Sequence, residues 1–261
     1  IARENNVDVV VGIGGGSSMD TAKAIAVEAA HEGTAWDYLF YKKEPTSATL
    51  PVVLVPTTSG TGSHVTQCAV VTKSEDEDKS ALWHDNIFAR AAIVDPDLPA
   101  TMPPRLTALT GFDAFCHNFE ALISRGTNIH VKSIALHAIG LIAEYLPRAV
   151  ADGSDMDARE ALCWADTLGG MAFSSAGVTL PHGLGMQISG HCPQVPHGAS
   201  LAAQYPAFFR FTWDSAVEDF AQVGRILDPA LTGVDDRTAA EASCTAVEGF
   251  LSKIDLKIDL K

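Results

Sequence analysis

The chain has 261 residues, of which 47% are hydrophobic and 19% are charged. This composition is that of a globular protein, because a disordered chain has fewer hydrophobic residues and a membrane span needs about 18 uninterrupted ones, which do not occur here. The formal net charge of -14 makes nucleic acid and anionic membranes poor partners. The five cysteines form no CxxC pair, which argues against a disulfide framework or a structural zinc cluster and favours a reducing, cytoplasmic location.

The first hundred residues alternate short hydrophobic runs with amphipathic stretches, as is typical of an α/β domain. The runs VDVVVGI (7–13) and PVVLVP (51–56) are nearly continuous, as expected of parallel strands that are covered on both faces. Further short runs lie at 69–72 and 91–94, and an amphipathic stretch at 19–30. The chain opens close to its first strand, so we expect the N-terminal domain to be incomplete at its start.

A proline-rich seam, DPDLPATMPP (95–104), precedes a region rich in Ala, Leu and Ile at helical spacing. We place a domain boundary in this seam, with residues 1–98 forming a parallel-sheet α/β domain and residues 99–261 forming an all-α domain. The spacing of hydrophobic residues in the second domain predicts helices over 104–124, 129–149, 155–173, 178–190, 214–226 and 236–252.

A glycine-rich turn, GIGGGSSMD (12–20), follows the first strand and opens a helix. Glycine lets the backbone approach a ligand closely, and the free N–H groups of a helix start favour a diphosphate. The GxGxxG dinucleotide fingerprint is imperfect because its last glycine is replaced by Ser17. The alternative is a purely structural turn in which Ser17 or Ser18 caps the helix.

A threonine-rich turn, PTTSGTGS (56–63), follows the second strand and offers five hydroxyl groups. Ligands of open α/β sheets bind at the carboxyl ends of the strands. Taken alone, this segment is equally typical of a solvated loop. Two turns of this kind in one small sheet together favour a nucleotide site.

Asp113 and His117 lie four residues apart in a predicted helix, so their side chains leave the same face. Two further histidines, His182 and His197, each stand between Pro and Gly. One carboxylate with imidazoles suits Fe(II) or Zn(II). A single buried histidine is more often a hydrogen-bonded core residue, but the pair and the two PHG units together indicate a metal site. His191 lies close enough in sequence to line the same pocket as a catalytic acid, or to have no role.

Taken in order, four segments resemble the iron-containing, or group III, alcohol dehydrogenases: GGGSSMDTAK (14–23), PTTSGTGSHVT (56–66), MPPRLTALTGFDAFCHNFEALIS (102–124) and the two PHG units (181–198). The resemblance covers about residues 5–210. It implies a dinucleotide-binding domain followed by a helical domain, with a catalytic metal in the cleft between them. It also implies hydride transfer between NAD or NADP and an alcohol/aldehyde or hydroxyacid/oxoacid pair.

The resemblance assigns roles to individual residues. The metal ligands would be Asp113, His117, His182 and His197. The cofactor would be bound by residues of the two turns and by one lysine: Gly14, Gly15, Gly16 and Ser17 at the pyrophosphate, Asp20 in the same motif, Thr57, Thr58 and Thr61 near the phosphate and the nicotinamide ribose, and Lys79 at that ribose. His191, a water molecule or the ribose hydroxyls would transfer the proton.

Two departures from the family pattern bear on the reaction. His64 stands where many members have Glu, and Met186 stands where alcohol dehydrogenases often have a histidine that relays a proton. The segment 176–190 looks closer to the hydroxyacid-oxoacid transhydrogenase branch, which is the first alternative. A metal-dependent lyase or hydrolase on the same scaffold is the second. The expected partners are a small-molecule alcohol, aldehyde or hydroxyacid and, in a homo-oligomer, a second copy of the chain.

Overall fold

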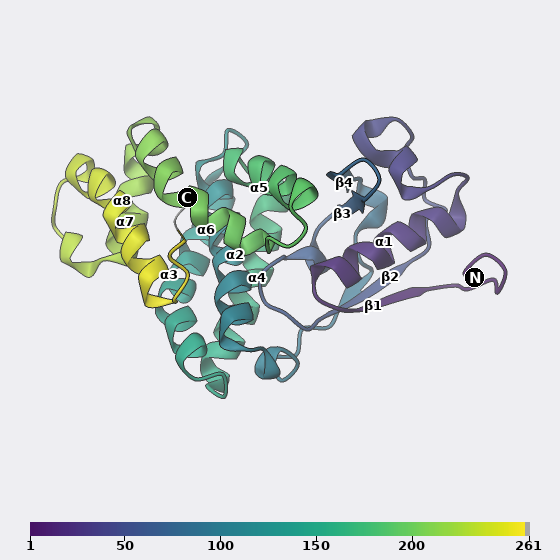
Figure 1. The fold of residues 1–261 in the computed structure, drawn as a ribbon, viewed down its shortest axis with the longest axis horizontal. Coiled ribbons are helices and arrows are strands. Elements are labelled where there is room, and N and C mark those ends of the chain that lie inside the picture. Colours follow the sequence, from purple (N-terminus) through teal and green to yellow (C-terminus); the bar gives the residue numbers. More distant parts are fainter. Residues whose placement is uncertain (259–261) are drawn as a thin grey trace.

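The computed structural model describes residues 1–258, in which an α/β half precedes a helical half (Figure 1). A parallel sheet of three strands has the order β1-β2-β5, with β1 at Val10–Gly14, β2 at Val52–Pro56 and β5 at Ala91–Ala92. Helix α1 (Gly16–Ala30) follows β1 directly. The predicted parallel pairing of the two hydrophobic runs is confirmed, because Val10 to Gly14 pair in register with Val52 to Pro56.

Up to residue 258, the helical half contains seven α-helices: α2 (Pro104–Ile123), α3 (Ile129–Ala151), α4 (Met156–Ala176), α5 (Leu180–His191), α6 (His197–Thr212), α7 (Val217–Leu227) and α8 (Asp236–Lys253). Helix α2 lies at the centre and is buried on nearly all sides. Its phenylalanines Phe112, Phe115 and Phe119 form an aromatic cluster with Tyr205 and Phe209 of α6. Burial of each such ring contributes roughly 1.5–3 kcal/mol, so the central helix is held rigidly.

The prediction of an α/β domain followed by an all-helical domain is confirmed, but two elements were not predicted. Helix α6 begins at His197 behind Pro196 and contains Pro206, two prolines that hide its helical character in the sequence. The charged stretch around residues 74–80 hides β4 (Asp78–Trp83), which forms a separate antiparallel hairpin with β3 (Cys68–Lys73).

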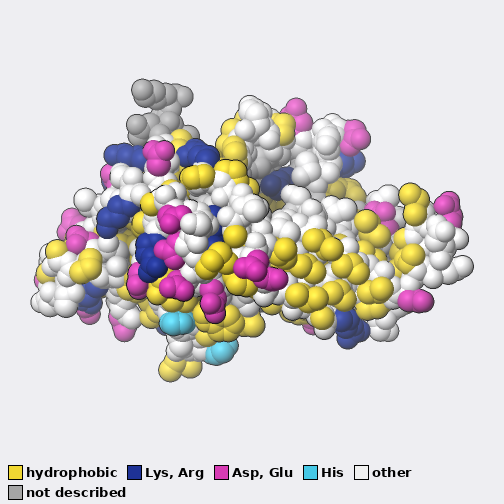
Figure 2. Space-filling model, turned by 90° about the horizontal axis from the view of Figure 1, so that it is seen from below, with side chains coloured by type: hydrophobic (Ala, Val, Ile, Leu, Met, Phe, Trp, Pro, Cys, Tyr) yellow, Lys and Arg dark blue, Asp and Glu magenta, His cyan; other side chains and the backbone are white. Residues whose placement is uncertain are grey.

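One face of the parallel sheet is covered and the other is open. Helix α1 packs Met19, Ala22 and Ala26 against Val52 and Leu54 of β2. On the other face, the β1 side chains of Val11 and Ile13 are 53% and 64% exposed. The N-terminal half accordingly carries a broad hydrophobic patch in Figure 2. The prediction that these strands are covered on both faces is therefore wrong for the described residues, because no described element packs on that side.

Among the described residues, α3 is the one helix that is long and apolar enough to cross a membrane, a property that core helices of soluble proteins share. Here α3 packs against α2 and α4 through buried side chains that include Val131, Ile139, Ile142 and Leu146. In this structure it is therefore a helix of the core.

Candidate functional site

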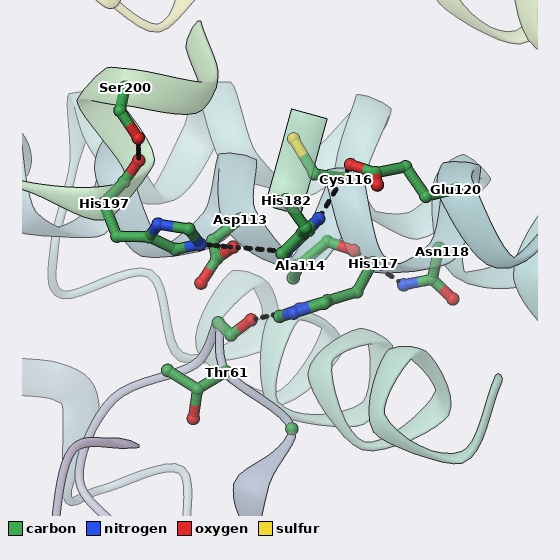
Figure 3. A network of polar contacts seen from close by, with 12 residues as sticks. Thr61, Asp113, Ala114, Cys116, His117, Asn118, Glu120, His182, His197 and Ser200 are labelled. Carbon is green, nitrogen blue, oxygen red and sulfur yellow. Dashed lines mark hydrogen bonds and ion pairs between the residues drawn. The ribbon is translucent and has the colours of Figure 1, made fainter. Parts of the chain in front are cut away.

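Three side chains converge, one from the central helix α2 and one each from α5 and α6 (Figure 3). Asp113 comes from the middle of α2, His182 from the first turn of α5 and His197 from the first position of α6. The Oδ1 atom of Asp113 lies 3.4 Å from Nε2 of His182 and 3.7 Å from Nε2 of His197. One possible ligand atom from each residue lies within 4.8 Å of the other two. We call these three residues the metal group.

The metal group leaves buried polar atoms without partners. Asp113 Oδ1 and His182 Nε2, which face each other in the metal group, are buried and make no hydrogen bond, and Nδ1 of His197, the ring nitrogen other than the one nearest Asp113, also has no partner. Buried polar atoms are nearly always hydrogen-bonded, and each one left unpaired costs about 1–3 kcal/mol. A divalent cation would satisfy such atoms, and a donor set of one carboxylate and imidazoles suits Fe(II) or Zn(II). The residues present therefore fit a metal.

The protonation states of Asp113, His117 and His197 also favour the binding of a metal ion. Burial by itself raises the pKa of Asp113, but the imidazoles of His117, His197 and His182 hold it well below its ordinary value. Burial lowers the pKa of His117 to about 4 and also lowers the pKa of His197. At neutral pH Asp113 is thus a carboxylate and His117 and His197 are neutral imidazoles, the forms that bind a metal, whereas His182 releases a proton when it binds one.

The fourth predicted ligand, His117, lies against the metal group rather than in it. Its ring stacks on His182 with centroids 4.4 Å apart and on Phe173 with centroids 4.5 Å apart. Its Nδ1 lies 3.1 Å from the carbonyl oxygen of Gly60 in the threonine turn. The structure therefore brings three of the four predicted ligands together and places the fourth in contact with them.

Glu120 is a residue of the site that the sequence analysis missed. It is fully buried, and its Oε1 accepts a hydrogen bond of 2.7 Å from Nδ1 of His182. Burial disfavours the charged form of His182, but Glu120 and Asp113 raise its pKa to about 10. A sequence signal existed, since Glu120 follows His117 by three residues and Asp113 by seven and so shares their helix face.

The glycine turn opens α1 without a side-chain cap. Gly15 is the N-cap residue in an extended conformation, and no side chain bonds the first N–H groups of the helix. The structural alternative, with Ser17 or Ser18 as the cap, is therefore not what forms. Gly15, Gly16 and Ser17 line the cleft, so the uncapped helix start faces a space in which a diphosphate could bind.

The two turns touch each other. A Cβ atom on Gly16 would lie 2.7 Å from the Thr61 side chain, and one on Gly15 would lie 3.3 Å from that of Thr58. Gly16 has no room for a Cβ unless Thr61 moves, and a Cβ on Gly15 would be in tight contact with Thr58. The two turns are therefore neighbours at one edge of the sheet.

The remaining predicted cofactor residues occupy different positions. Thr58, Thr61 and Lys79 line the cleft. Asp20 reaches the wall of the cleft, but its carboxylate accepts hydrogen bonds from Ser63 Oγ and from the Val70 N–H. Thr57 and Gly14 are not among the described residues that line the cleft, and the Thr57 N–H donates to the Gly14 carbonyl.

The structure does not bring His191 to the metal group. It is exposed at the end of α5, and its Nδ1 lies 3.1 Å from the Glu77 carbonyl at the tip of the β3–β4 hairpin. His182 lies near the start of the same helix, nine residues earlier, which corresponds to roughly 13 Å along the helix axis. The helical geometry of α5 separates the two residues that closeness in sequence had grouped.

A cleft of about 1140 Å³ joins these features. One wall is made by the glycine and threonine turns, another by the β3–β4 hairpin, and its floor by the metal group. Both halves of the chain contribute, so the glycine turn and the metal group face one common space.

The chain belongs to the iron-containing alcohol dehydrogenase family. Residues 1–96 match the family described as "Iron-containing alcohol dehydrogenase", and residues 107–261 match "Fe-containing alcohol dehydrogenase family, C-terminal". The resemblance found in the sequence is thereby confirmed.

Relatives cover nearly all of the chain. It is 37% identical over 250 residues to an NAD-dependent methanol dehydrogenase of Bacillus methanolicus, covering 96% of this chain and 65% of that protein. It is 36% identical to a 1,3-propanediol dehydrogenase of Klebsiella pneumoniae, covering 95% of this chain and 63% of that protein. The chain thus spans less than two thirds of the length of these two relatives.

Solved structures share the fold. A 1,3-propanediol oxidoreductase superposes with a TM-score of 0.91 at 35% identity, covering 98% of this chain and 66% of that one. An archaeal halo-thermophilic Red Sea brine pool alcohol dehydrogenase superposes with a TM-score of 0.94 at 38% identity, covering 99% of this chain and 68% of that one.

Proposed function

We propose that this chain carries the cofactor-binding and metal-binding parts of an alcohol dehydrogenase that transfers a hydride between a nicotinamide cofactor and a small alcohol or aldehyde. The observation that carries the proposal is the convergence of Asp113, His182 and His197, with buried, unpartnered atoms on Asp113 and His182, in the same cleft as an uncapped helix start. A metal site alone would suit a hydrolase, and a phosphate-binding turn alone would suit many nucleotide-binding proteins. Their shared cleft favours a metal-dependent, dinucleotide-dependent enzyme.

On the cofactor side, Gly15, Gly16 and Ser17 would bind the pyrophosphate through the N–H groups at the start of α1. Thr58 and Thr61 would contact the phosphate and ribose from the opposite turn.

Lys79 faces the cleft, where burial lowers the pKa of its ammonium group while Asp113 and Asp20 oppose the shift. We assign Lys79 to the nicotinamide ribose. Thr57, Gly14 and Asp20 would act indirectly, because their hydrogen bonds hold the two turns together.

On the metal side, Asp113, His182 and His197 would hold Fe(II) or Zn(II), with His117 as the fourth ligand. When bound, such an ion polarises a substrate carbonyl or stabilises an alkoxide. Phe173, Val178 and Met186 give this part of the cleft a hydrophobic wall. Met186 cannot carry a proton, so we propose that a water molecule or the ribose hydroxyls transfer it and that His191 lies outside the reacting centre.

We propose NAD as the cofactor, because the similar methanol dehydrogenase is named as NAD-dependent. A cytoplasmic location agrees with five cysteines that are all free. The division into domains 1–98 and 99–261 and a homo-oligomer remain predictions of the sequence.

The proposal is tested on the whole protein by metal analysis together with a screen of alcohols, aldehydes and hydroxyacids with NAD and NADP. We expect about one Fe or Zn per chain and a change in nicotinamide absorbance that depends on an alcohol or aldehyde. A hydrolase would give no absorbance change, and a lyase that recycles its cofactor would give no net NADH. Conversion of a hydroxyacid plus an oxoacid without added cofactor would identify the transhydrogenase alternative instead.

A further inference from the structure

Glu120 is a buried carboxylate that faces away from the cleft. It is 0% exposed and is not among the described residues that line the cleft. Its Oε1 accepts from Nδ1 of His182 at 2.7 Å and from the Tyr205 hydroxyl at 3.1 Å. Its Oε2 accepts from the Thr179 N–H at 2.6 Å and from the Thr179 hydroxyl at 3.0 Å. Burial alone would raise the pKa of Glu120, but His182 and the hydrogen bonds from Thr179 lower it.

These contacts determine which nitrogen of His182 is free. A neutral imidazole donates through one ring nitrogen and offers a lone pair through the other. With Nδ1 donating to Glu120, the proton that His182 gives up when a metal binds is the one on Nε2, the atom that lies 3.4 Å from Asp113 Oδ1 and has no hydrogen-bond partner. Glu120 therefore selects the tautomer of His182 that presents its free nitrogen to the metal group.

The same carboxylate also fixes where His182 is placed. Thr179 is the N-cap residue of α5, and both its N–H and its hydroxyl bond to Glu120. His182 follows in the first turn of that helix. Because Glu120 belongs to α2, as Asp113 does, it ties the start of α5 to the helix that supplies the carboxylate ligand.

We propose that Glu120 is a positioning residue for the metal, which orients His182 and fixes its tautomer. The inference rests on the proposed function, since it requires that Asp113, His182 and His197 bind a metal. Carboxylates that orient a ligating histidine typically contribute about 10–100-fold to metal affinity.

The test is the substitution Glu120→Gln, which keeps the shape of the side chain. All four groups that bond Glu120 can donate a hydrogen bond, and the Thr179 N–H can only donate. The NH2 of the new amide is also a donor, so it cannot replace the oxygen that accepts from the Thr179 N–H. If the NH2 turns instead toward His182, the ring must accept through Nδ1 and carry its proton on Nε2, where it blocks metal binding. Glu144→Gln makes the same chemical change at an exposed position of α3 and serves as the matched control.

The measurement is the dissociation constant for Zn(II), obtained by competition with a chromophoric chelator on the metal-stripped whole protein, with folding checked by circular dichroism. We expect Glu120→Gln to weaken Zn(II) binding by about 10–100-fold and Glu144→Gln to leave it unchanged. Equal affinity in wild type and Glu120→Gln would overturn the positioning role. Failure of the wild type itself to bind Zn(II) or Fe(II) would instead overturn the proposed function.

A measurement on the wild type covers the case in which Glu120→Gln does not fold. In the Zn(II)-loaded protein labelled with 15N-histidine, the imidazole proton of His182 should reside on Nδ1, at low field because it is shared with a carboxylate. The signal is assigned by its loss in His182→Gln. A His182 proton found on Nε2 would overturn the inference.

Discussion

The ligand atoms of the metal group are costly to the fold when no cation is bound. Asp113 and His182 are only 6% and 5% exposed, and each has a buried atom without a hydrogen bond. Such atoms cost about 1–3 kcal/mol each. Burial of the aromatic cluster of α2 and α6 opposes this cost, and its packing brings the helices of Asp113 and His197 together. At the residue scale, the site is therefore preorganised for a cation, which we expect to stabilise the folded chain.

His197→Ala should lose metal and activity together, because it removes one ligand and leaves Asp113 with one fewer imidazole to balance its charge. We expect the loss of Zn(II) affinity to exceed the roughly 10–100-fold typical of residues outside the coordination sphere. His137→Ala, at an exposed position of α3, is the control. Metal content and turnover are measured on both variants, and a His197→Ala protein with full metal and normal turnover would remove His197 from the ligand set.

Helix α1 and the threonine turn are joined by a buried lysine. Lys23 is 0% exposed, and its Nζ donates to the carbonyl oxygens of Ser63, Thr66 and Cys68. Burial lowers its pKa to about 8, while Asp20 opposes the shift. Asp20 in turn accepts from the Ser63 hydroxyl. At the element scale, α1 thus fixes the position of the turn that faces its own N-terminus.

Gly16→Ala should separate the two turns, because its Cβ would lie 2.7 Å from the Thr61 side chain. We expect a KM for the nicotinamide cofactor raised by about tenfold, equivalent to roughly 1.4 kcal/mol, with metal content unchanged. Gly140→Ala in α3, where a Cβ would meet nothing within 4 Å, is the matched control. An unchanged cofactor KM in Gly16→Ala would argue against the pyrophosphate assignment.

The end of α5 meets the tip of the β3–β4 hairpin across the cleft. A Cβ on Gly190 would lie 2.6 Å from the Glu77 carbonyl oxygen, and His191 bonds the same carbonyl through Nδ1. The hairpin also carries Lys79, so this contact fixes one cofactor-facing residue relative to the helix of His182.

His191→Ala tests whether that residue transfers the proton. A general acid or base contributes roughly 10²–10⁴-fold to the rate, whereas an exposed residue that only contacts the hairpin should change kcat by less than tenfold. We expect the smaller effect, with an unaltered pH profile of kcat. A loss of kcat beyond 10²-fold with metal retained would restore His191 as the catalytic acid.

The two halves of the molecule are held together where α4 contacts the threonine turn. Asp166 accepts a 2.7 Å hydrogen bond from the Gly62 N–H. Next to it, Gly170 approaches Gly62 so closely that neither position has room for a Cβ. His64, the departure from the family's Glu, is 1% exposed and bonds the hydroxyl of Thr167 at 2.9 Å. At the scale of the whole molecule, the ligand-facing turn is therefore also the joint between the halves.

Asp166 should make the stability of the metal-free protein depend on pH. Burial raises its pKa to about 7, against the backbone hydrogen bonds of Gly60 and Gly62, and Asp113 adds to the rise. Between about pH 4 and 7 the folded state holds a proton that the unfolded state has lost. This carboxyl therefore contributes less stability as the pH rises through that window.

The substitution Asp166→Asn removes this titration. The free energy of unfolding of the variant relative to the wild type should rise with pH up to about pH 7 and then level off, by about 1.4 kcal/mol per pH unit at most. The measurement is urea unfolding of both metal-free proteins at several pH values. Taking the difference between the two free energies of unfolding cancels the contribution of the other titrating groups. A flat difference between the two proteins would show that Asp166 is ionised in the folded state.

Local sequence patterns predicted much of the site. The glycine and threonine turns follow the ends of β1 and β2, and the carboxyl ends of strands are where ligands of open α/β sheets bind. Asp113 and His117 share a helix face because the period of the helix requires it. Glu120 shares that face too, but a single acidic residue in a hydrophobic helix gives no sign of its partner until α5 and α6 are placed.

The sequence by itself determined the order of the two halves, the positions of most helices and the residue types able to bind a metal and a diphosphate, since these depend on short-range periodicity and on chemistry. Only the tertiary structure decided that His182 and His197 meet Asp113 while His191 does not, and that Glu120 orients His182. The reason is physical: these relationships depend on how α2, α5 and α6 pack around a common core, and residues far apart along the chain become neighbours only through that packing.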